Sequence, residues 1–369
     1  MQEEKKILEI DGVEAEDSST INPITRPFDP KKIDITTKQM ILEAIFRRLR
    51  ENEIDLNTYF QRNMDLWNKT QQSRLIESIL LSLPLPAFYF DGSDDNKWLI
   101  VDGLQRLSTF KNYIIEKNFK LQNLEFLQQF DGYGFNELPR ELQRRIEEHE
   151  ITVYIINPGT PGEVKFNLFR RINTGGLMLN AQEIRHTINQ GIPTRLIAEL
   201  AELDNFKKYK INPKRMLDRD FVTRFLAFYI NGPEKYKPDL DTFLNDSMAA
   251  LKELSDKKRE QIKADFEKAV LAAGKIFGQH AFRKRYHIDG RKNPLNKALF
   301  ETWTVALAKL QNDELKKVTA REEALNRLFI DAMNNDKDFE KAITQATGDI
   351  KRVKKRFSVI KGLIEKVLK

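Results

Sequence analysis

Cysteine is absent from this chain of 369 residues, and only four histidines are present. Without a thiol, the protein can form neither disulfides nor thiolate metal sites, and it has no cysteine nucleophile. No two of the histidines have the spacing of a zinc site. Because cysteine-poor chains suit a reducing compartment, we expect a cytoplasmic protein.

Long apolar runs are also missing. No segment is apolar over the roughly 20 residues that a membrane-spanning helix needs, and the first residues lack the apolar centre of a signal peptide. We therefore expect no membrane partner. The Gly- and Lys-containing motif of P-loop nucleotide hydrolases is absent as well, which excludes that class.

The overall composition is that of a globular protein with a positive net charge. Hydrophobic residues make up 40% and charged residues 32% of the chain, and the formal net charge is +7. The length allows two domains. A basic balance is compatible with nucleotide or nucleic-acid partners, although many acidic residues offset it.

The most informative stretch runs from residue 98 to residue 110. Its apolar start predicts a strand, Asp102-Gly103 predicts a turn, and the residues from Leu104 predict a helix. A helix start attracts anions, and Arg106 in the first turn could clamp a phosphate. Asp102 could hold a ribose hydroxyl, a metal-bound water or an arginine. The alternative is purely structural: Asp102 caps the helix and Arg106 pairs with a nearby carboxylate.

Asp102-Gly103-Leu104-Gln105-Arg106 resembles the Asp-Gly-Gln-Gln-Arg signature of the GmrSD-type restriction endonuclease N-terminal domain family, which belongs to the ParB/sulfiredoxin-like superfamily. Leu104 replaces the first glutamine. The resemblance extends over roughly residues 28–310. It includes the sequence Phe-Gln-Arg…Trp at 60–67, the Pro-Leu-Pro step at 84–86, and the stretch Phe-Arg-Arg-Ile-Asn…Gly…Leu-Asn…Glu-Ile-Arg at 169–185.

This resemblance implies an α+β fold, with a small mixed-sheet ParB/sulfiredoxin-like domain at residues 28–190. Residues 1–27 are polar and predict a flexible or extended arm. Helical periodicity replaces strand signals from about residue 191, so we expect an all-helical domain at 191–369. Sulfiredoxin chemistry itself is excluded because it needs a thiol.

The resemblance also implies a nucleoside-triphosphate hydrolase associated with DNA restriction and anti-phage defence. The implied catalytic residues are Asp102, Gln105 and Arg106. The implied nucleotide- or phosphate-binding residues are Gly103, Leu104, Arg62, Arg170, Asn173 and Arg185. The expected cofactors are a nucleoside triphosphate and, with it, Mg²⁺, and we assign no metal-ligating residues. Arg62 could equally stack on Trp67, and Glu183 with Asn180 forms a capping box that already explains both residues.

The last helical segment carries a basic face that could follow a phosphate backbone. The candidate nucleic-acid-binding residues are Lys351, Arg352, Lys354, Lys355 and Arg356. The alternative is a terminal helix that packs on the helical domain and leaves its lysines in solvent.

Two further functions stay open. One is a non-catalytic DNA-binding module, and the other is a ParB-like nuclease. Many relatives carry an HNH nuclease motif, which we do not find, so a separate nuclease subunit is a candidate partner, as are DNA and a second copy of this chain. Glu163-Val164-Lys165 has the form of a Glu-x-Lys nuclease motif, but no aspartate partner is evident from the sequence.

Overall fold

The computed structural model describes residues 9–10, 12–15, 30–56, 67–94, 96–172 and 179–369. Contacts divide the chain into two compact units. One unit comprises residues 28–179, and the other comprises residues 180–369 together with the described part of residues 1–27. The boundary in the chain lies between residues 179 and 180. The helix at 181–188 belongs to the second unit, where Arg185 makes ion pairs with Asp220 and Asp241.

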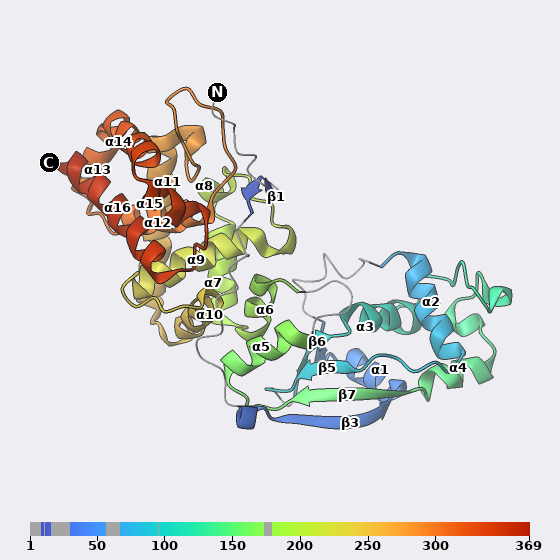
Figure 1. Ribbon diagram of the computed structural model, residues 1–369. Helices are drawn as coiled ribbons and strands as arrows, with labels where there is room; N and C mark the ends of the chain where they lie inside the picture. Colours follow the sequence, from blue (N-terminus) through green and yellow to red (C-terminus); the bar gives the residue numbers. More distant parts are fainter. Residues whose placement is uncertain (1–8, 11, 16–29, 57–66, 95, 173–178) are drawn as a thin grey trace. The chain divides into compact units, whose positions relative to one another are not determined.

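The N-terminal unit is built on a mixed five-stranded sheet with the strand order β3-β7-β5-β6-β4. The strands are β3 (Ile35–Ile41), β4 (Ile54–Asp55), β5 (Phe88–Asp91), β6 (Trp98–Asp102) and β7 (Glu150–Ile156). The pairs β5–β7 and β4–β6 are parallel, and the other two are antiparallel. The apolar, β-branched strand β7 lies inside the sheet between β3 and β5, as its composition predicts (Figure 1).

Helices cover the sheet, and residues of the first four of them close its core. They are α1 (Leu42–Arg50), α2 (Lys69–Leu80), α3 (Leu104–Phe110), α4 (Arg140–Glu147) and α5 (Gly162–Ile172), and a π-helical turn at Lys111–Ile115 extends α3. Phe46 of α1, Ile76 of α2 and Phe110 of α3 pack with Phe88 and Phe90 of the sheet in one buried cluster. This cluster lies on one side of the sheet, because Phe88 and Phe90 point to the same face.

Residues 36–41 form a strand and not the start of a helix. Either Thr36 or Thr37 has the chemistry of a helix N-cap, but both residues pair with β7, opposite Ile155 and Tyr154. The helix begins at Leu42, after the strand ends. The threonines suit the half-exposed surface of an edge strand, so pairing with β7 overrides that capping chemistry.

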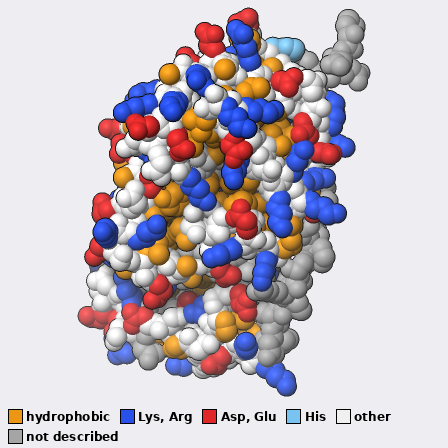
Figure 2. Space-filling model, turned by 90° about the vertical axis from the view of Figure 1, so that its left-hand side faces the viewer, with side chains coloured by type: hydrophobic (Ala, Val, Ile, Leu, Met, Phe, Trp, Pro, Cys, Tyr) orange, Lys and Arg blue, Asp and Glu red, His pale blue; other side chains and the backbone are white. Residues whose placement is uncertain are grey.

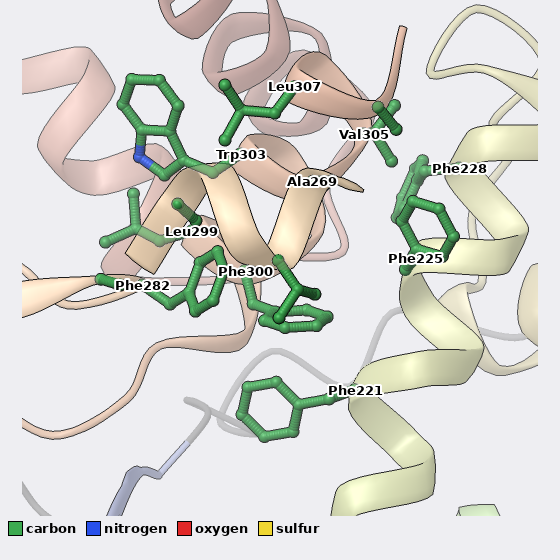
Figure 3. Packing of buried hydrophobic residues seen from close by; sticks show 14 of the residues in the cluster. Phe221, Phe225, Phe228, Ala269, Phe282, Leu299, Phe300, Trp303, Val305 and Leu307 are labelled. Carbon is green, nitrogen blue, oxygen red and sulfur yellow. The ribbon is translucent and has the colours of Figure 1, made fainter. Parts of the chain in front are cut away.

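In its described residues, the second unit is helical apart from one short strand pair and two isolated bridges at Leu295. Its helices are α6 (Ala181–Ile188), α7 (Ile192–Ala201), α8 (Asp204–Lys207), α9 (Leu217–Asn231), α10 (Leu240–Ala250), α11 (Asp256–Phe277), α12 (Lys297–Ala308), α13 (Asn312–Ala320), α14 (Glu322–Asn335), α15 (Lys337–Thr344) and α16 (Ile350–Leu368). Phe221 and Phe225 of α9 pack in the same buried cluster as Phe300 and Trp303 of α12 (Figure 3). Among the described residues, no helix is both long and apolar enough to cross a bilayer.

Part of the segment predicted as a flexible arm is ordered. Strands β1 (Glu9–Ile10) and β2 (Val13–Glu14) pair with each other, and the amide of Glu14 donates to the carbonyl of Leu295 at 2.8 Å. The side chain of Val13 is buried in the helical core. Residues 1–8, 11 and 16–27 lie outside the described residues.

Candidate functional site

The strand–turn–helix predicted around Asp102 is present. Strand β6 ends at Asp102, Gly103 turns the chain with φ of +102°, and α3 begins at Leu104. A Cβ atom on Gly103 would lie 2.5 Å from Cδ1 of Phe88 and 3.3 Å from Nη2 of Arg106. Glycine is therefore required both by the backbone conformation and by the neighbouring side chains. Gly103 is buried, and protein atoms fill the space beside it.

Arg106 faces the protein and not an open phosphate site. Its side chain is only 10% exposed, and Nη2 donates to Oδ2 of Asp102 at 2.8 Å and to the carbonyl of Ala87 at 3.1 Å. Nη1 donates to the carbonyl of Pro86, and the guanidinium lies over the ring of Phe88 at 4.1 Å from the ring centroid.

These contacts correct the sequence prediction that Arg106 clamps a phosphate. The structural alternative, pairing with a carboxylate, describes its position. The physical reason is that the chain entering β5 brings two carbonyl groups next to the first turn of α3, and a buried guanidinium must satisfy its donors.

Asp102 remains the more accessible member of the pair. Its side chain is 21% exposed, and the side chains of Leu104 and Gln105 beside it are half-buried. Burial raises the pKa of Asp102 above its ordinary value, and the nearby Arg106 offsets this rise only in part. Arg106 thus holds a partly buried carboxylate in position at the end of β6.

Two tyrosines on neighbouring strands lie beside this carboxylate. Tyr89 of β5 is opposite Asp102 of β6 in the register and opposite Tyr154 of β7 on its other side. The two rings stack with their centroids 4.8 Å apart and an interplanar angle of 19°. Burial raises the pKa of Tyr89, and the neighbouring Tyr154 and Asp102 add to this rise.

The remaining nucleotide-binding candidates do not gather here as one described site. Arg62 and Asn173 lie outside the described residues. Arg170 is exposed on the last turn of α5. Arg185, predicted to contact nucleotide, is buried in the helical unit, where it donates to Asp220 at 2.9 Å and to Asp241 at 2.8 Å.

The burial of Arg185 corrects its predicted role. Its donors are taken by two carboxylates and by Oε1 of Gln182 at 2.9 Å. The capping box next to it is confirmed, since Asn180 and Glu183 each accept a hydrogen bond from the other's amide. Residues 180–185, the last part of the stretch that resembles the family, thus have structural roles.

The predicted basic face of α16 is smaller than the sequence suggested. Arg356 is fully buried and pairs with Glu301, so it is not available to nucleic acid. Lys355 pairs with Asp336 at 2.8 Å, and Arg352 donates to the carbonyl of Gln345.

Lys351 and Lys354 are the members of this set that are exposed. Val353, Ile360, Leu363, Ile364 and Val367 on the other face of α16 are buried, as the packed-helix alternative predicted. Figure 2 shows Lys and Arg side chains mixed with Asp and Glu over one face of the molecule, and not a surface of one sign.

One pair of charged residues was missed by sequence reasoning. Nζ of Lys165 on α5 lies 3.0 Å and 3.1 Å from the two carboxylate oxygens of Asp91, at the end of β5, and also contacts Oγ of Ser93. The side chains of Lys165 and Asp91 are 10% and 8% exposed. The Glu-x-Lys sequence thus has an aspartate partner, but within the described residues no three metal-ligating side chains cluster. The signal in the sequence that could have indicated this pair was the position of Asp91 at the end of a strand, directly before a turn.

Comparison with known families adds one finding. Residues 42–189 match the model of the GmrSD restriction endonuclease, N-terminal domain. The match contains the complete junction from β6 to α3 and both tyrosines. No significant match was found among curated proteins or among solved structures.

Proposed function

Because residues 42–189 belong to the GmrSD restriction endonuclease N-terminal domain family, we propose that this protein acts on DNA in restriction-type defence and that its N-terminal unit binds and hydrolyses a nucleoside triphosphate. The observation that carries the nucleotide-binding part is the half-buried carboxylate of Asp102, held by Arg106 at 2.8 Å at the end of a strand. A carboxylate in such a position binds ligands without first having to be ordered.

In this proposal Asp102 contacts the ligand, and Arg106 is a positioning residue. Asp102 accepts a hydrogen bond from a ribose hydroxyl or holds a water bound to Mg²⁺. One carboxylate together with phosphate oxygens is the usual way in which proteins bind Mg²⁺. The donor set thus fits an ion that arrives with the nucleotide and supplies neutralising charge to its phosphates.

Gln105 is the second residue of α3 and has the chemistry to orient an attacking water. It is half-buried in the first turn of α3, two residues after Gly103. A side-chain amide can donate a hydrogen bond to a water, and Oε1 of Gln105 is itself buried, so the proposal gives Gln105 the role of a donor. Hydrolysis therefore depends on Asp102 and Gln105 through contact, and on Arg106 through the orientation of Asp102.

The direct experiment measures release of inorganic phosphate by the purified protein. Wild type and Asp102→Asn are compared with each of ATP, GTP, CTP and UTP in the presence of Mg²⁺. Asp94→Asn is the matched control, because Asp94 is an exposed aspartate of the same unit. We expect turnover in wild type and in the control and a loss of at least tenfold in Asp102→Asn. Equal rates in all three proteins would refute the assignment.

The second candidate is DNA binding without nucleotide turnover. The observation that favours it is the exposed pair Lys351 and Lys354 on α16, in a chain of net charge +7. It predicts DNA affinity that falls steeply with salt and no phosphate release. Plasmid nicking assayed with the same preparations tests the nuclease alternative, which Asp102→Asn would then have to abolish.

A further inference from the structure

A row of four residues crosses the sheet of the N-terminal unit. The register places Asp102 of β6, Tyr89 of β5, Tyr154 of β7 and Thr37 of β3 opposite one another in that order. Adjacent strands are about 4.8 Å apart, so a ligand lying across this row touches several strands at once. The centroid separation of the tyrosines, 4.8 Å, matches that strand spacing.

The tyrosine rings lie on the sheet face opposite the hydrophobic core. Phe88 and Phe90, on either side of Tyr89, are fully buried in that core, whereas Tyr89 and Tyr154 are both partly exposed. Side chains alternate between the two faces of a strand, so the ring pair points away from the core. Thr37, next in the row, is exposed and small.

Tyr89 and Tyr154 each carry a hydroxyl group that can donate and accept a hydrogen bond. Within the described part of the chain, neither hydroxyl makes a hydrogen bond to protein. Because the two rings stack on each other, each covers one face of the other, and the π face left for a ligand beside Asp102 is the outer face of Tyr89. The carboxylate of Asp102, next in the row, is a hydrogen-bond acceptor. Flat aromatic surface combined with an acceptor is the chemistry that binds a base and its sugar or amino group.

We propose that Tyr89, backed by the stacked ring of Tyr154, forms a stacking platform for a nucleobase, with Asp102 accepting a hydrogen bond from the sugar or from an amino group of that base. This inference rests on the proposed function, since it names the part of the ligand that the same site recognises. It assigns the binding energy to the base and not to a phosphate clamp, which agrees with the internal contacts of Arg106. The base can come from a free nucleotide or from an unpaired nucleotide of DNA.

The test compares equilibrium binding to wild type and to the double variant Tyr89→Leu/Tyr154→Leu. The probes are the four nucleoside triphosphates, inorganic tripolyphosphate and a single-stranded oligonucleotide of mixed sequence. Loss of aromatic stacking weakens binding of a base by about 5- to 100-fold. We expect this loss for the probes that contain a base and no change for tripolyphosphate. The variant Tyr89→Phe/Tyr154→Phe keeps both rings, and we expect it to bind base within about threefold of wild type.

Tyr133→Leu is the matched control. Tyr133 is an exposed tyrosine of the same unit, and it contacts the ring of Phe130 with centroids 5.6 Å apart. We expect its affinity for every probe to equal that of wild type. Wild-type affinity of the double leucine variant for base-containing probes would overturn the platform while leaving nucleotide hydrolysis by wild type intact.

The two sources of the base give different results. If wild type binds free triphosphates and the leucine variant does not, the platform and the proposed function are both supported. Binding of the oligonucleotide alone, again lost in the variant, supports the platform and refutes the nucleotide-hydrolase function. If wild type binds neither kind of probe, the platform is refuted.

A second measurement does not depend on the folding of a variant. Tetranitromethane nitrates accessible tyrosines, and mass spectrometry of the wild-type protein reports each site separately. Addition of the probe that binds should protect Tyr89 and Tyr154 at least threefold and leave Tyr133 unprotected. Equal nitration of Tyr89 and Tyr154 with and without the bound probe would contradict the proposal.

Discussion

Replacing Arg106 by methionine tests whether its guanidinium group stabilises the fold or binds phosphate. Methionine keeps an unbranched apolar chain over Phe88 but removes the donors to Asp102 and to the carbonyls of Pro86 and Ala87. Removing one partner of a buried ion pair costs about 3–5 kcal/mol. Because Asp102 is 21% exposed, we expect the lower end, about 3 kcal/mol.

The assay is urea unfolding followed by the fluorescence of Trp98, which is buried in the core of the N-terminal unit. In a unit of this size a loss of about 3 kcal/mol corresponds to a midpoint about 6–12 °C lower in a thermal scan. Arg140→Met is the matched control, because Arg140 pairs with Glu147 on the surface and its side chain is 64% exposed. We expect no resolvable change in the control.

The loss should depend on pH with a definite sign. Burial raises the pKa of Asp102 in the folded protein, and Arg106 counteracts that rise, so the variant should have a still higher pKa at this carboxyl. A raised pKa means that folding disfavours the charged form. The free-energy cost of burying the charged Asp102 carboxylate is therefore fully present at neutral pH. It is relieved as the pH falls through the pKa that this carboxyl has in the folded protein.

The difference in unfolding free energy between wild type and Arg106→Met should accordingly be largest near pH 7 and smaller near about pH 4. A variant that keeps wild-type stability at pH 7 but loses all nucleotide binding would refute this reasoning. It would instead support the prediction that Arg106 binds a phosphate. A loss of stability that is equal at both pH values would contradict the role of Asp102 in it.

Three further changes test other parts of the structure. Lys165→Met leaves Asp91 buried without its cation, so we expect the free energy of unfolding to fall by about 3–5 kcal/mol, and an unchanged urea midpoint would contradict the pairing. Arg356→Met should destabilise the helical unit at low and high salt alike, whereas Lys354→Ala should leave the midpoint unchanged and lower the salt slope of DNA binding by about one. Gly103→Ala should cost at least about 1 kcal/mol, because alanine is strained at this positive φ, and wild-type stability in thermal unfolding would argue against the observed turn.

Local sequence patterns predicted the local structure of the candidate site. The change from an apolar run to helical spacing at Asp102-Gly103 located the strand, the turn and the helix, because each depends on neighbouring residues. The capping box at Asn180 and Glu183 was predictable for the same reason. The all-helical second part likewise followed from where strand patterns end and continuous helical periodicity begins, whereas the small mixed sheet was implied by the family resemblance.

Partners that are distant in the sequence were not predictable in this way. Nothing near Arg106 shows that the carbonyls of Pro86 and Ala87 will lie against it, because their approach depends on the pairing of β5 with β6. The contact of Lys165 with Asp91 likewise arises only when α5 packs next to the sheet. Such contacts decide whether a charged residue faces a ligand or the interior.

The central claim is that Asp102 is the group at the end of β6 that contacts a nucleotide and that Arg106 only holds it in place. The most direct measurement is nucleotide affinity in wild type, Asp102→Asn and Arg106→Lys, determined by calorimetry together with a urea titration of each protein. We predict that Asp102→Asn stays folded and loses at least tenfold in affinity, while any loss in Arg106→Lys accompanies a loss of stability. Full affinity in a folded Asp102→Asn protein would contradict the account.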